Sequence, residues 1–249
     1  MRLVEKFVLG ETGECSFYEP GGIVVDNKGN IYITDSGNSR IVKFDSRGKF
    51  IGSFGRRGKG PGEFISPWKV EIYEGKLYVL DSDNRNIQKF TLNGDYISGF
   101  KLRAGIFLDF VIDSKGNIYV GRWATNKNQF LIDKYNNAGK FLKSFGKPLE
   151  ARSRPLTWIS NNFVLCKDTQ DNLYLAFRYI NKIRKYNSEG KLLKEFKREL
   201  SYAPAPPRRS SHSERLFEVD GVTGDIFCDQ KGSCLLYTSD AADEGLGVD

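Results

Sequence analysis

Between Gly22 and Phe54 the hydrophobic and polar positions form four short runs that are separated by turn residues. The runs are Ile23–Asp26, Ile31–Asp35, Ile41–Phe44 and Phe50–Phe54. Each consists mainly of β-branched or aromatic residues, and clusters of Gly, Asn, Asp and Ser divide them, which is typical of strands joined by tight turns. The pattern predicts a four-stranded antiparallel meander. One such sheet is too small to be stable alone, so it should pack against copies of itself.

The same pattern recurs along the chain. Its most regular marker is a tyrosine in the second run of each copy, at Tyr32, Tyr78, Tyr119 and Tyr174, with intervals of 46, 41 and 55 residues. Units of this length with four strands each are typical of β-propeller blades and not of helical solenoids. The predicted fold is therefore an all-β propeller built of four-stranded antiparallel blades.

Two motifs carry a closer resemblance. The stretch Gly58–Phe64, of the type GxGPGEF, is followed by a strand, and Gly29–Phe44 reads GNIYITDSGNSRIVKF. In these features the chain resembles the NHL-repeat family over residues 5 to 233. In the first copy, Asp35–Arg40 forms a loop of the type Asp-Ser-x-Asn-x-Arg. The match weakens at 121–126 and 177–181, where this loop is replaced by other residues. The resemblance implies a propeller of six blades in the intact protein and implies no single activity.

Residues 1–233 are expected to form part of such a propeller, with four blades and the start of a fifth. Residues 4–9 would be the closing strand of a last blade, and the Pro-, Ser- and Arg-rich stretch 201–215 is predicted to be a long loop. The expected blades cover residues 19–56, 65–102, 105–147, 158–198 and 216–233.

Residues 234–249 break the pattern. Cys234–Glu244 reads CLLYTSDAADE and resembles the translation of a transposase adapter used in sequencing libraries, and Gly247-Val248-Asp249 fits the continuation of that adapter. We interpret this tail as foreign to the protein; a short native helix at 239–246 is the alternative. The tail has four acidic residues and no basic one, so that without it the formal charge rises from +7 to +11.

Composition narrows the class further. No apolar run is long enough to span a membrane, and Met1 leads directly into a strand pattern, so we expect no membrane span and no signal peptide within this chain. A leader further upstream stays open, and so does the compartment. The four cysteines have neither metal nor disulfide spacing, and Cys166 and Cys228 are interpreted as buried free thiols. No obligate oligomer is expected of the intact protein.

The residues offer little catalytic chemistry. The single histidine, His212, lies in a polar insert with nothing to orient it, and no zinc spacing is present. Gly58–Gly62 precedes a strand and not a helix, which argues against a phosphate-binding loop. Asp35 and Asp81 are expected to accept backbone hydrogen bonds in the loops they open. We predict no cofactor and favour a role that is not enzymatic.

In a propeller, the loops between second and third strands emerge on the same face as the connections between blades. Basic and aromatic residues gather in these segments, and the opposite face has few. Such a face suits an acidic partner, whether RNA, an acidic protein segment or an anionic glycan; a basic rim that only aids solubility is the other interpretation. The predicted ligand-binding residues are Arg40, Arg56, Arg57, Lys59, Arg85, Arg122, Trp123, Arg178 and Tyr179.

A second function stays open from another class. Propeller hydrolases of the lactonase type hold a divalent cation with carboxylates at the inner strand ends, and Asp109, Asp168 and Asp220 are the candidates here. Aspartates at strand ends more often cap turns. Thermal stabilisation by calcium would separate this hydrolase from a binding module.

Overall fold

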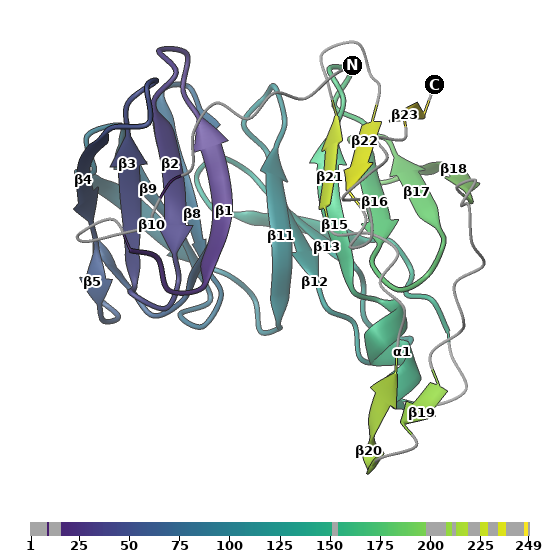
Figure 1. Cartoon of the computed structure of the whole chain (residues 1–249). Helices are drawn as coiled ribbons and strands as arrows, with labels where there is room; N and C mark the ends of the chain where they lie inside the picture. Colours follow the sequence, from purple (N-terminus) through teal and green to yellow (C-terminus); the bar gives the residue numbers. More distant parts are fainter. Residues whose placement is uncertain are drawn as a thin grey trace. The chain divides into compact units, whose positions relative to one another are not determined.

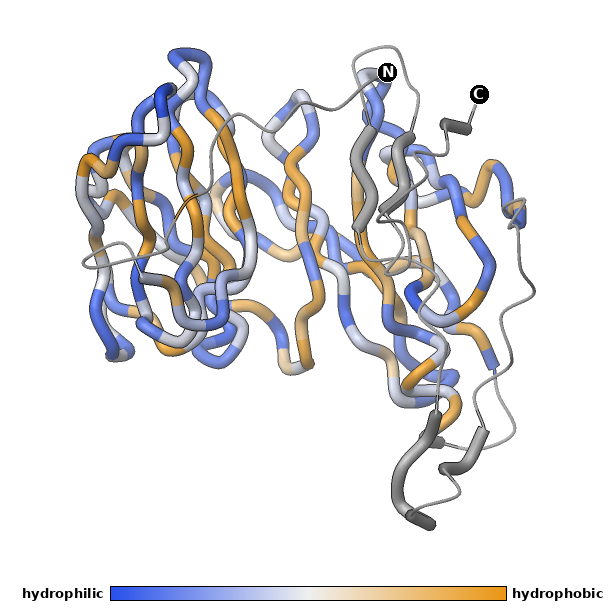
Figure 2. Tube along the Cα trace, viewed as in Figure 1, coloured by the Kyte–Doolittle hydropathy of each residue, from blue (hydrophilic) through white to orange (hydrophobic). Residues whose placement is uncertain are grey.

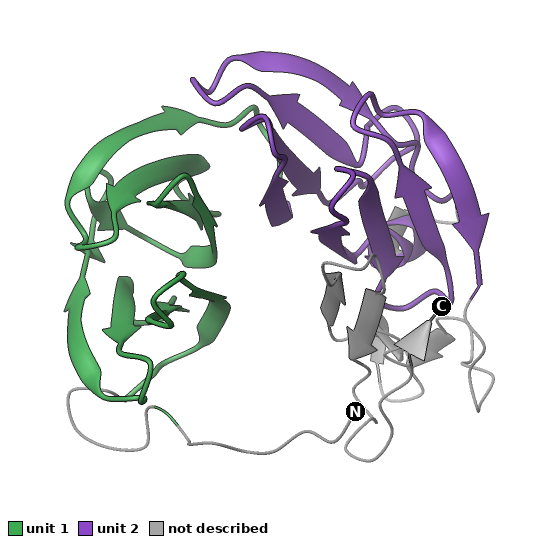
Figure 3. Ribbon diagram, turned by 90° about the horizontal axis from the view of Figure 1, so that it is seen from above, with its two compact units in different colours: residues 1–106 green, residues 107–249 purple. Residues whose placement is uncertain are grey.

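The computed structural model describes Leu9 and residues 16–150 and 156–197 in full. Of residues 154–155 and of five short strands between residues 208 and 248 it describes the backbone alone. The chain divides into two compact units, Met1–Ile106 and Phe107–Asp249 (Figure 3).

Unit 1 contains two four-stranded antiparallel sheets, in which strands that follow one another in the sequence are neighbours (Figure 1). A short parallel pair, β5 (Arg56–Arg57) with β6 (Glu63–Phe64), lies in the crossover that joins the two sheets. The first sheet comprises β1 (Pro20–Val25), β2 (Ile31–Asp35), β3 (Arg40–Phe44) and β4 (Phe50–Phe54), and the second comprises β7 (Pro67–Tyr73), β8 (Lys76–Asp81), β9 (Asn86–Thr91) and β10 (Tyr96–Lys101).

Unit 2 repeats this arrangement with two more four-stranded sheets, and the helix α1 (Arg154–Ser160) lies between them in the sequence. The four sheets confirm the predicted propeller blades. The third sheet comprises β11 (Phe107–Ile112), β12 (Ile118–Arg122), β13 (Ile132–Tyr135) and β14 (Phe141–Phe145), and the fourth comprises β15 (Phe163–Lys167), β16 (Leu173–Phe177), β17 (Ile183–Tyr186) and β18 (Leu192–Phe196).

Five short strands follow the fourth sheet. β19 (Arg208–Ser210) pairs with β20 (Ser213–Glu218), so part of the stretch expected to be a long loop forms an antiparallel ladder. β21 (Asp225–Cys228) pairs with β22 (Cys234–Tyr237), which pairs with β23 (Gly247–Val248). The foreign origin of residues 234–249 stays a prediction, because a sequence such as Leu-Leu-Tyr is compatible with a strand whatever its source. Residues 4–8 of the expected closing strand and residues 238–246 lie outside the described part of the chain.

The residues of the turns determine where one strand ends and the next begins. Hydrophilic turns alternate with hydrophobic strands along the chain (Figure 2). In the turn between β1 and β2, one carboxylate oxygen of Asp26 accepts hydrogen bonds from the backbone N–H of Lys28 and of Asn30, both at 2.9 Å. The turn between β7 and β8 uses Glu74 and Gly75, whose φ angles of 48° and 67° are those that a tight type I′ hairpin requires.

The second strand of each sheet is buried on both faces almost throughout, which explains why β2, β8, β12 and β16 are apolar on both sides. In unit 1, Tyr32, Val79 and Phe90 belong to one core between the two sheets, whereas Ile33 and Val42 face the other side of the first sheet with Leu9. In unit 2 alternate residues of β15 divide in the same way. Phe163 and Leu165 join the core shared with the third sheet, and Val164 and Cys166 join a smaller cluster.

A tyrosine and a lysine on adjacent strands form a contact that recurs in all four sheets. The lysine Nζ lies 5.3, 5.1, 5.1 and 4.9 Å from the centroid of the marker tyrosine ring, which is a cation–π arrangement. The pairs are Tyr32 with Lys43, Tyr78 with Lys89, Tyr119 with Lys134 and Tyr174 with Lys185.

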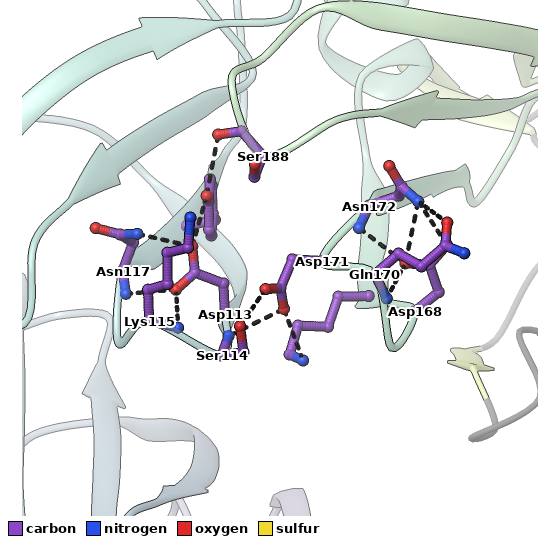
Figure 4. A network of polar contacts seen from close by, with 11 residues as sticks. Asp113, Ser114, Lys115, Asn117, Asp168, Gln170, Asp171, Asn172 and Ser188 are labelled. Atoms are coloured by element: carbon purple, nitrogen blue, oxygen red, sulfur yellow. Dashed lines mark hydrogen bonds and ion pairs between the residues drawn. The ribbon is translucent and has the colours of Figure 1, made fainter.

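The third and fourth sheets are joined by a polar network around these tyrosines (Figure 4). The Tyr119 hydroxyl shares its one hydrogen between Asp113 Oδ2 at 2.9 Å and the carbonyl oxygen of Ser188 at 3.0 Å. Ser114 donates from its backbone N–H and its hydroxyl to Asp171, at 2.9 and 2.5 Å. Turns of the third sheet are thus fixed to turns of the fourth by groups that are also part of the turns themselves.

The structure corrects one further expectation and adds one element that was not predicted. Cys166 is disulfide-bonded and is not a free thiol. Its strand β15 lies beside β21 in unit 2, a proximity created by packing that the spacing of cysteines in the sequence does not reveal. The helix α1 was not predicted, although Pro155 near its start is a residue that helices favour in their first turn. In the part of the chain that is described, no helix has the length and apolar character needed to cross a membrane.

Candidate functional site

The candidate site in unit 1 lies where the loop between β8 and β9 meets the crossover that leads into the second sheet. Asp81, at the end of β8, is fully buried and accepts hydrogen bonds from the backbone N–H of Ile65 at 2.9 Å and of Ser66 at 3.0 Å. Asp35 does the same for the N–H of Tyr18 at 2.8 Å. Both aspartates accept backbone hydrogen bonds, but these come mainly from the segments before β1 and β7. In the loops that the aspartates open, Asp81 accepts the Asn84 N–H at 3.2 Å as predicted, whereas the backbone donor to Asp35, Tyr18, precedes β1.

Asn84 joins the loop to the crossover. Its side-chain Nδ2 donates to the carbonyl oxygen of Gly58 and to Asp81 Oδ2, both at 2.8 Å. Its own carbonyl oxygen accepts a hydrogen bond from Lys101 Nζ at 3.0 Å. Since Arg85 follows Asn84 and Lys59 follows Gly58, these contacts bring Lys59, Arg85 and Lys101 into one neighbourhood.

The basic residues predicted in unit 1 differ in their availability. Arg57, Lys59 and Arg85 are exposed, and their side chains form no ion pair with any described residue. Arg56 is also exposed, but its guanidinium lies 2.9 Å from Glu63 Oε1. Hydrogen bonds from the backbone of Gly60 and from Arg56 lower the pKa of Glu63, so this carboxylate stays charged at neutral pH.

Arg40 has a structural role that the sequence interpretation missed. Its Nε lies 2.8 Å from Oδ2 of the fully buried Asp35, and its terminal nitrogen donates to the carbonyl oxygen of Ser16 at 2.9 Å. A buried carboxylate needs a charged partner. The guanidinium of Arg40 is therefore used mainly by Asp35 and Ser16, and little of its charge is left for a partner.

Arg122 in unit 2 resembles Arg40. Its guanidinium pairs at 3.2 Å with Asp133, which is fully buried, and only 14% of the Arg122 side chain is exposed. The hydroxyl of Ser144 donates to the same carboxylate at 2.5 Å. Arg122 is thus held in place between neighbouring strands and presents little charge to solvent.

The predicted aromatic residue Trp123 stacks on Trp158 of α1, with ring centroids 4.4 Å apart and planes inclined by 19°. Its indole Nε1 donates to the Trp158 carbonyl oxygen. Arg178 and Tyr179 are partly buried after β16, and the Arg178 N–H donates to the Asn162 carbonyl oxygen at 2.8 Å, just beyond α1. Trp123 therefore contacts α1 itself, and Arg178 contacts the residue that lies two positions after α1.

A pocket of about 190 Å³ borders the site of unit 1 and was not predicted. Of the residues predicted from the sequence, Lys59 alone lines it. The only signal in the sequence is Gly99, a glycine inside an outer strand, which often marks a close approach or a space. The lining residues are Lys59, Gly60, Pro61, Asn86, Gln88, Tyr96, Gly99, Phe100 and Lys101.

The carboxylates considered for a cation have other partners. Asp109 accepts the backbone N–H of Phe110 at 2.8 Å and of Leu165 at 2.9 Å. Asp168 accepts the N–H of Gln170 and Asn172 and so caps its turn. Asp220 and His212 lie outside the described residues, within which no three metal-binding side chains form a cluster.

Comparison with known proteins agrees with the fold. The family model DUF5128, described as 6-bladed β-propeller, matches residues 2–197. The protein brain tumor of Drosophila melanogaster is 36% identical over 66 residues, which are 26% of this chain and 6% of that protein. The probable peptidyl-alpha-hydroxyglycine alpha-amidating lyase pgal-1 of Caenorhabditis elegans is 33% identical over 72 residues, which are 27% of this chain and 21% of that protein. Each match therefore spans about a fifth or less of the relative. Together with the family model, the two relatives confirm the predicted NHL-type propeller.

Solved structures resemble the chain in fold. Virginiamycin B lyase from Staphylococcus aureus superposes with a TM-score of 0.59 at 16% identity, over 92% of this chain and 69% of that one. A putative exported protein from Bacteroides fragilis gives a TM-score of 0.60 at 16% identity, over 75% and 52%. At such identity the likeness shows the fold alone.

Proposed function

Since the chain belongs to the family of six-bladed β-propellers matched by residues 2–197, we propose that it acts as a non-catalytic module that binds an acidic macromolecule. The binding site is the basic surface of unit 1, which we define as Arg57, Lys59, Arg85 and Lys101. RNA, an acidic protein segment and an anionic glycan share the charge that this surface recognises.

One observation carries the proposal. The Asn84 side chain holds the loop of Arg85 against the crossover of Lys59, at 2.8 Å from the Gly58 carbonyl oxygen, and Lys101 donates to Asn84 itself. Like charges repel, so cations are brought together at a cost unless an anion lies between them at least part of the time. A fixed cluster of exposed cations therefore favours binding over mere solubility.

The carboxylates support a binding module over a metal-dependent hydrolase. Asp109 and Asp168 each accept two backbone hydrogen bonds, which leaves them suited to holding strands and turns. The lyase names among the similar proteins belong to those proteins, and the fold they share hosts many activities.

A charge-matched pair of variants tests the proposal. The first replaces Arg57, Lys59 and Arg85 by Ala. The second replaces Lys28, Arg47 and Lys49, which are exposed in the turns at the opposite end of the first sheet. Binding to heparin, single-stranded RNA and poly-glutamate is measured over a range of salt concentrations.

We expect the first variant to lose affinity for at least one polyanion. The slope of log K against log salt concentration should become shallower by about two to three, because fewer counterions are released when fewer cations contact the polyanion. The second variant should bind like the wild type. Equal losses in both variants would mean that net charge alone drives binding, and the proposal would be wrong.

A further inference from the structure

The pocket beside the basic surface lies on one face of the β9–β10 pair. Asn86 is opposite Lys101 and Gln88 is opposite Gly99 in the ladder. Side chains that are opposite one another, and those two residues apart, point to the same face of a sheet. The crossover residues Lys59, Gly60 and Pro61 form the other side of the pocket.

Asn86 is the unusual group in this pocket. The residue is only 8% exposed, and its side-chain oxygen is buried without a hydrogen-bond partner among the described residues. Buried polar atoms are nearly always paired, so an unpaired one calls for an explanation. A ligand that brings a hydroxyl group would satisfy it.

Gln88, the second amide of the pocket, is already used. Its Oε1 accepts the backbone N–H of Gly62 at 2.9 Å, and its Nε2 donates to the Glu63 carbonyl oxygen at 2.7 Å. Gln88 therefore fixes the crossover above the strands, and this gives the pocket a defined wall. Asn86 remains available for the ligand.

The charges favour an anion. Lys59 is exposed and forms no ion pair with a described residue, and Lys101 uses one of its three N–H groups on the Asn84 carbonyl oxygen. The acidic residue of the crossover, Glu63, is held by Arg56 and by the Gly60 N–H. A carboxylate in the pocket would thus meet two lysines.

The remaining wall is aromatic and open. Tyr96 is 40% exposed, and Gly99 lets its hydroxyl approach the strand closely, because a β-carbon at residue 99 would lie only 3.3 Å from that hydroxyl and from the Ile87 carbonyl oxygen. A pocket of about 190 Å³ holds one ring and is too small for a typical cofactor or drug-sized ligand. An aromatic face, an amide acceptor and lysines together match a ring that has an apolar face, hydroxyl groups and a carboxylate.

We propose that this pocket binds a uronic acid unit of an anionic glycan. The ring packs on Tyr96, a ring hydroxyl donates to Asn86, and the carboxylate lies between Lys59 and Lys101. This inference rests on the proposed function, since the same basic surface would bind the neighbouring units of the glycan. A peptide carboxylate lacks the ring hydroxyls, and an RNA phosphate lacks the apolar ring face in the same unit.

The test uses the full chain and tri-galacturonate, with its methyl ester as the probe of the same shape without charge. Binding is measured by calorimetry. We expect the ester to bind at least tenfold more weakly than the acid. Asn86→Leu and Gly99→Val should each weaken binding of the acid at least tenfold, the first by removing the acceptor and the second by crowding Tyr96 at the wall of the pocket.

Ser98→Val is the matched control for Gly99→Val, because Ser98 is the adjacent, exposed residue of β10 and does not line the pocket. It should bind tri-galacturonate within twofold of the wild type. Asn86→Leu should also keep or raise the thermal unfolding temperature, since it removes an unpaired buried oxygen. A purely structural Asn86 would instead show a lower unfolding temperature with unchanged binding, and that result would overturn the inference.

Two outcomes separate this inference from the proposed function. If the wild type binds RNA or poly-glutamate but neither saccharide, the uronic acid site is wrong and the basic surface stands. If Arg57→Ala with Arg85→Ala abolishes all polyanion binding while the pocket variants behave as the wild type, the pocket is again wrong. Failure of the wild type to bind any polyanion would remove both.

Discussion

The Nζ of Lys134 lies 5.1 Å from the centroid of the Tyr119 ring, and both side chains donate hydrogen bonds to one carbonyl oxygen, that of Ser188. Tyr32 and Lys43 in unit 1 do the same for the Leu92 carbonyl oxygen, at 3.1 and 2.9 Å. The accepting carbonyl belongs to a turn of the next sheet in each case. Two of the tyrosines that mark the repeat, Tyr32 and Tyr119, thus join consecutive sheets by polar contacts as well as by their apolar rings.

This role predicts the effect of Tyr119→Phe. The change removes a hydroxyl that is bonded to both Asp113 and Ser188 and leaves the ring in the core. We expect the free energy of unfolding to fall by about 1–2 kcal/mol, because the buried carboxylate and the carbonyl lose the one donor that they share. Chemical denaturation measures it. Tyr179→Phe is the control in the same unit, and an equal loss there would contradict the explanation.

The lowered pKa of Asp168 predicts that the folded state loses stability in acid. Burial alone would raise the pKa of Asp168, but hydrogen bonds from Asn172 and the nearby Lys185 lower it overall. A carboxylate with a lowered pKa stabilises the folded state above the ordinary value of about 3.9, and this stabilisation is lost as the pH falls through the folded-state pKa.

The variant Asp168→Asn should therefore be less stable than the wild type at pH 7, by about 1–3 kcal/mol, and the difference should shrink below about pH 4. Denaturant titrations between pH 7 and pH 2.5 measure the difference. Tyr174→Phe keeps the carboxylate and should retain the acid-dependent loss. A difference that is constant over the whole pH range would show that Asp168 contributes by shape alone.

Much of the fold follows from local signals. The turn sequences and the tyrosine intervals locate the sheets, because a hairpin turn and a period of two depend on neighbouring residues only. The disulfide at Cys166 and the helix α1 depend on packing between sheets and were missed. Asp35 and Asp81 accept backbone hydrogen bonds as predicted, but most of these donors lie 15 to 17 residues away in the sequence, so they could not be named from the loops alone.

The candidate site was harder to predict. The sequence places Arg40 and Arg122 at strand ends, but their ion pairs with the buried Asp35 and Asp133 exist only because adjacent strands bring the charges together. The pocket likewise requires the crossover to lie above β9 and β10. A count of basic residues in loops therefore overestimates the charge that is available to a partner.

Arg40→Ala and Arg85→Ala should change different properties, the first the stability of the fold and the second the affinity for polyanions. Loss of Arg40 leaves the buried Asp35 without its cation, so we expect unfolding to become easier by about 2–4 kcal/mol with polyanion affinity within twofold of the wild type. Loss of the exposed Arg85 should change stability by less than about 0.5 kcal/mol and weaken polyanion binding. Residue 85 already has a β-carbon at a φ of 52°, so Ala adds no backbone strain. Denaturation and heparin binding, measured on both variants, decide between the two roles.

Glu63→Gln should strengthen binding to polyanions. Glu63 neutralises Arg56 at 2.9 Å, and Gln keeps an oxygen that can accept the Gly60 N–H while it removes the negative charge. The released Arg56 would add one cation beside Arg57, so we expect affinity to rise by about twofold to fivefold at low salt, in line with the strength of an exposed ion pair. Because salt screens exposed charges, the gain should disappear near 0.5 M salt. Glu74→Gln makes the same change of charge in the turn between β7 and β8, at the opposite end of the second sheet, and should leave the affinity unchanged. If both variants bind more tightly by the same factor, the protein's net charge, and not the basic surface of unit 1, determines the affinity.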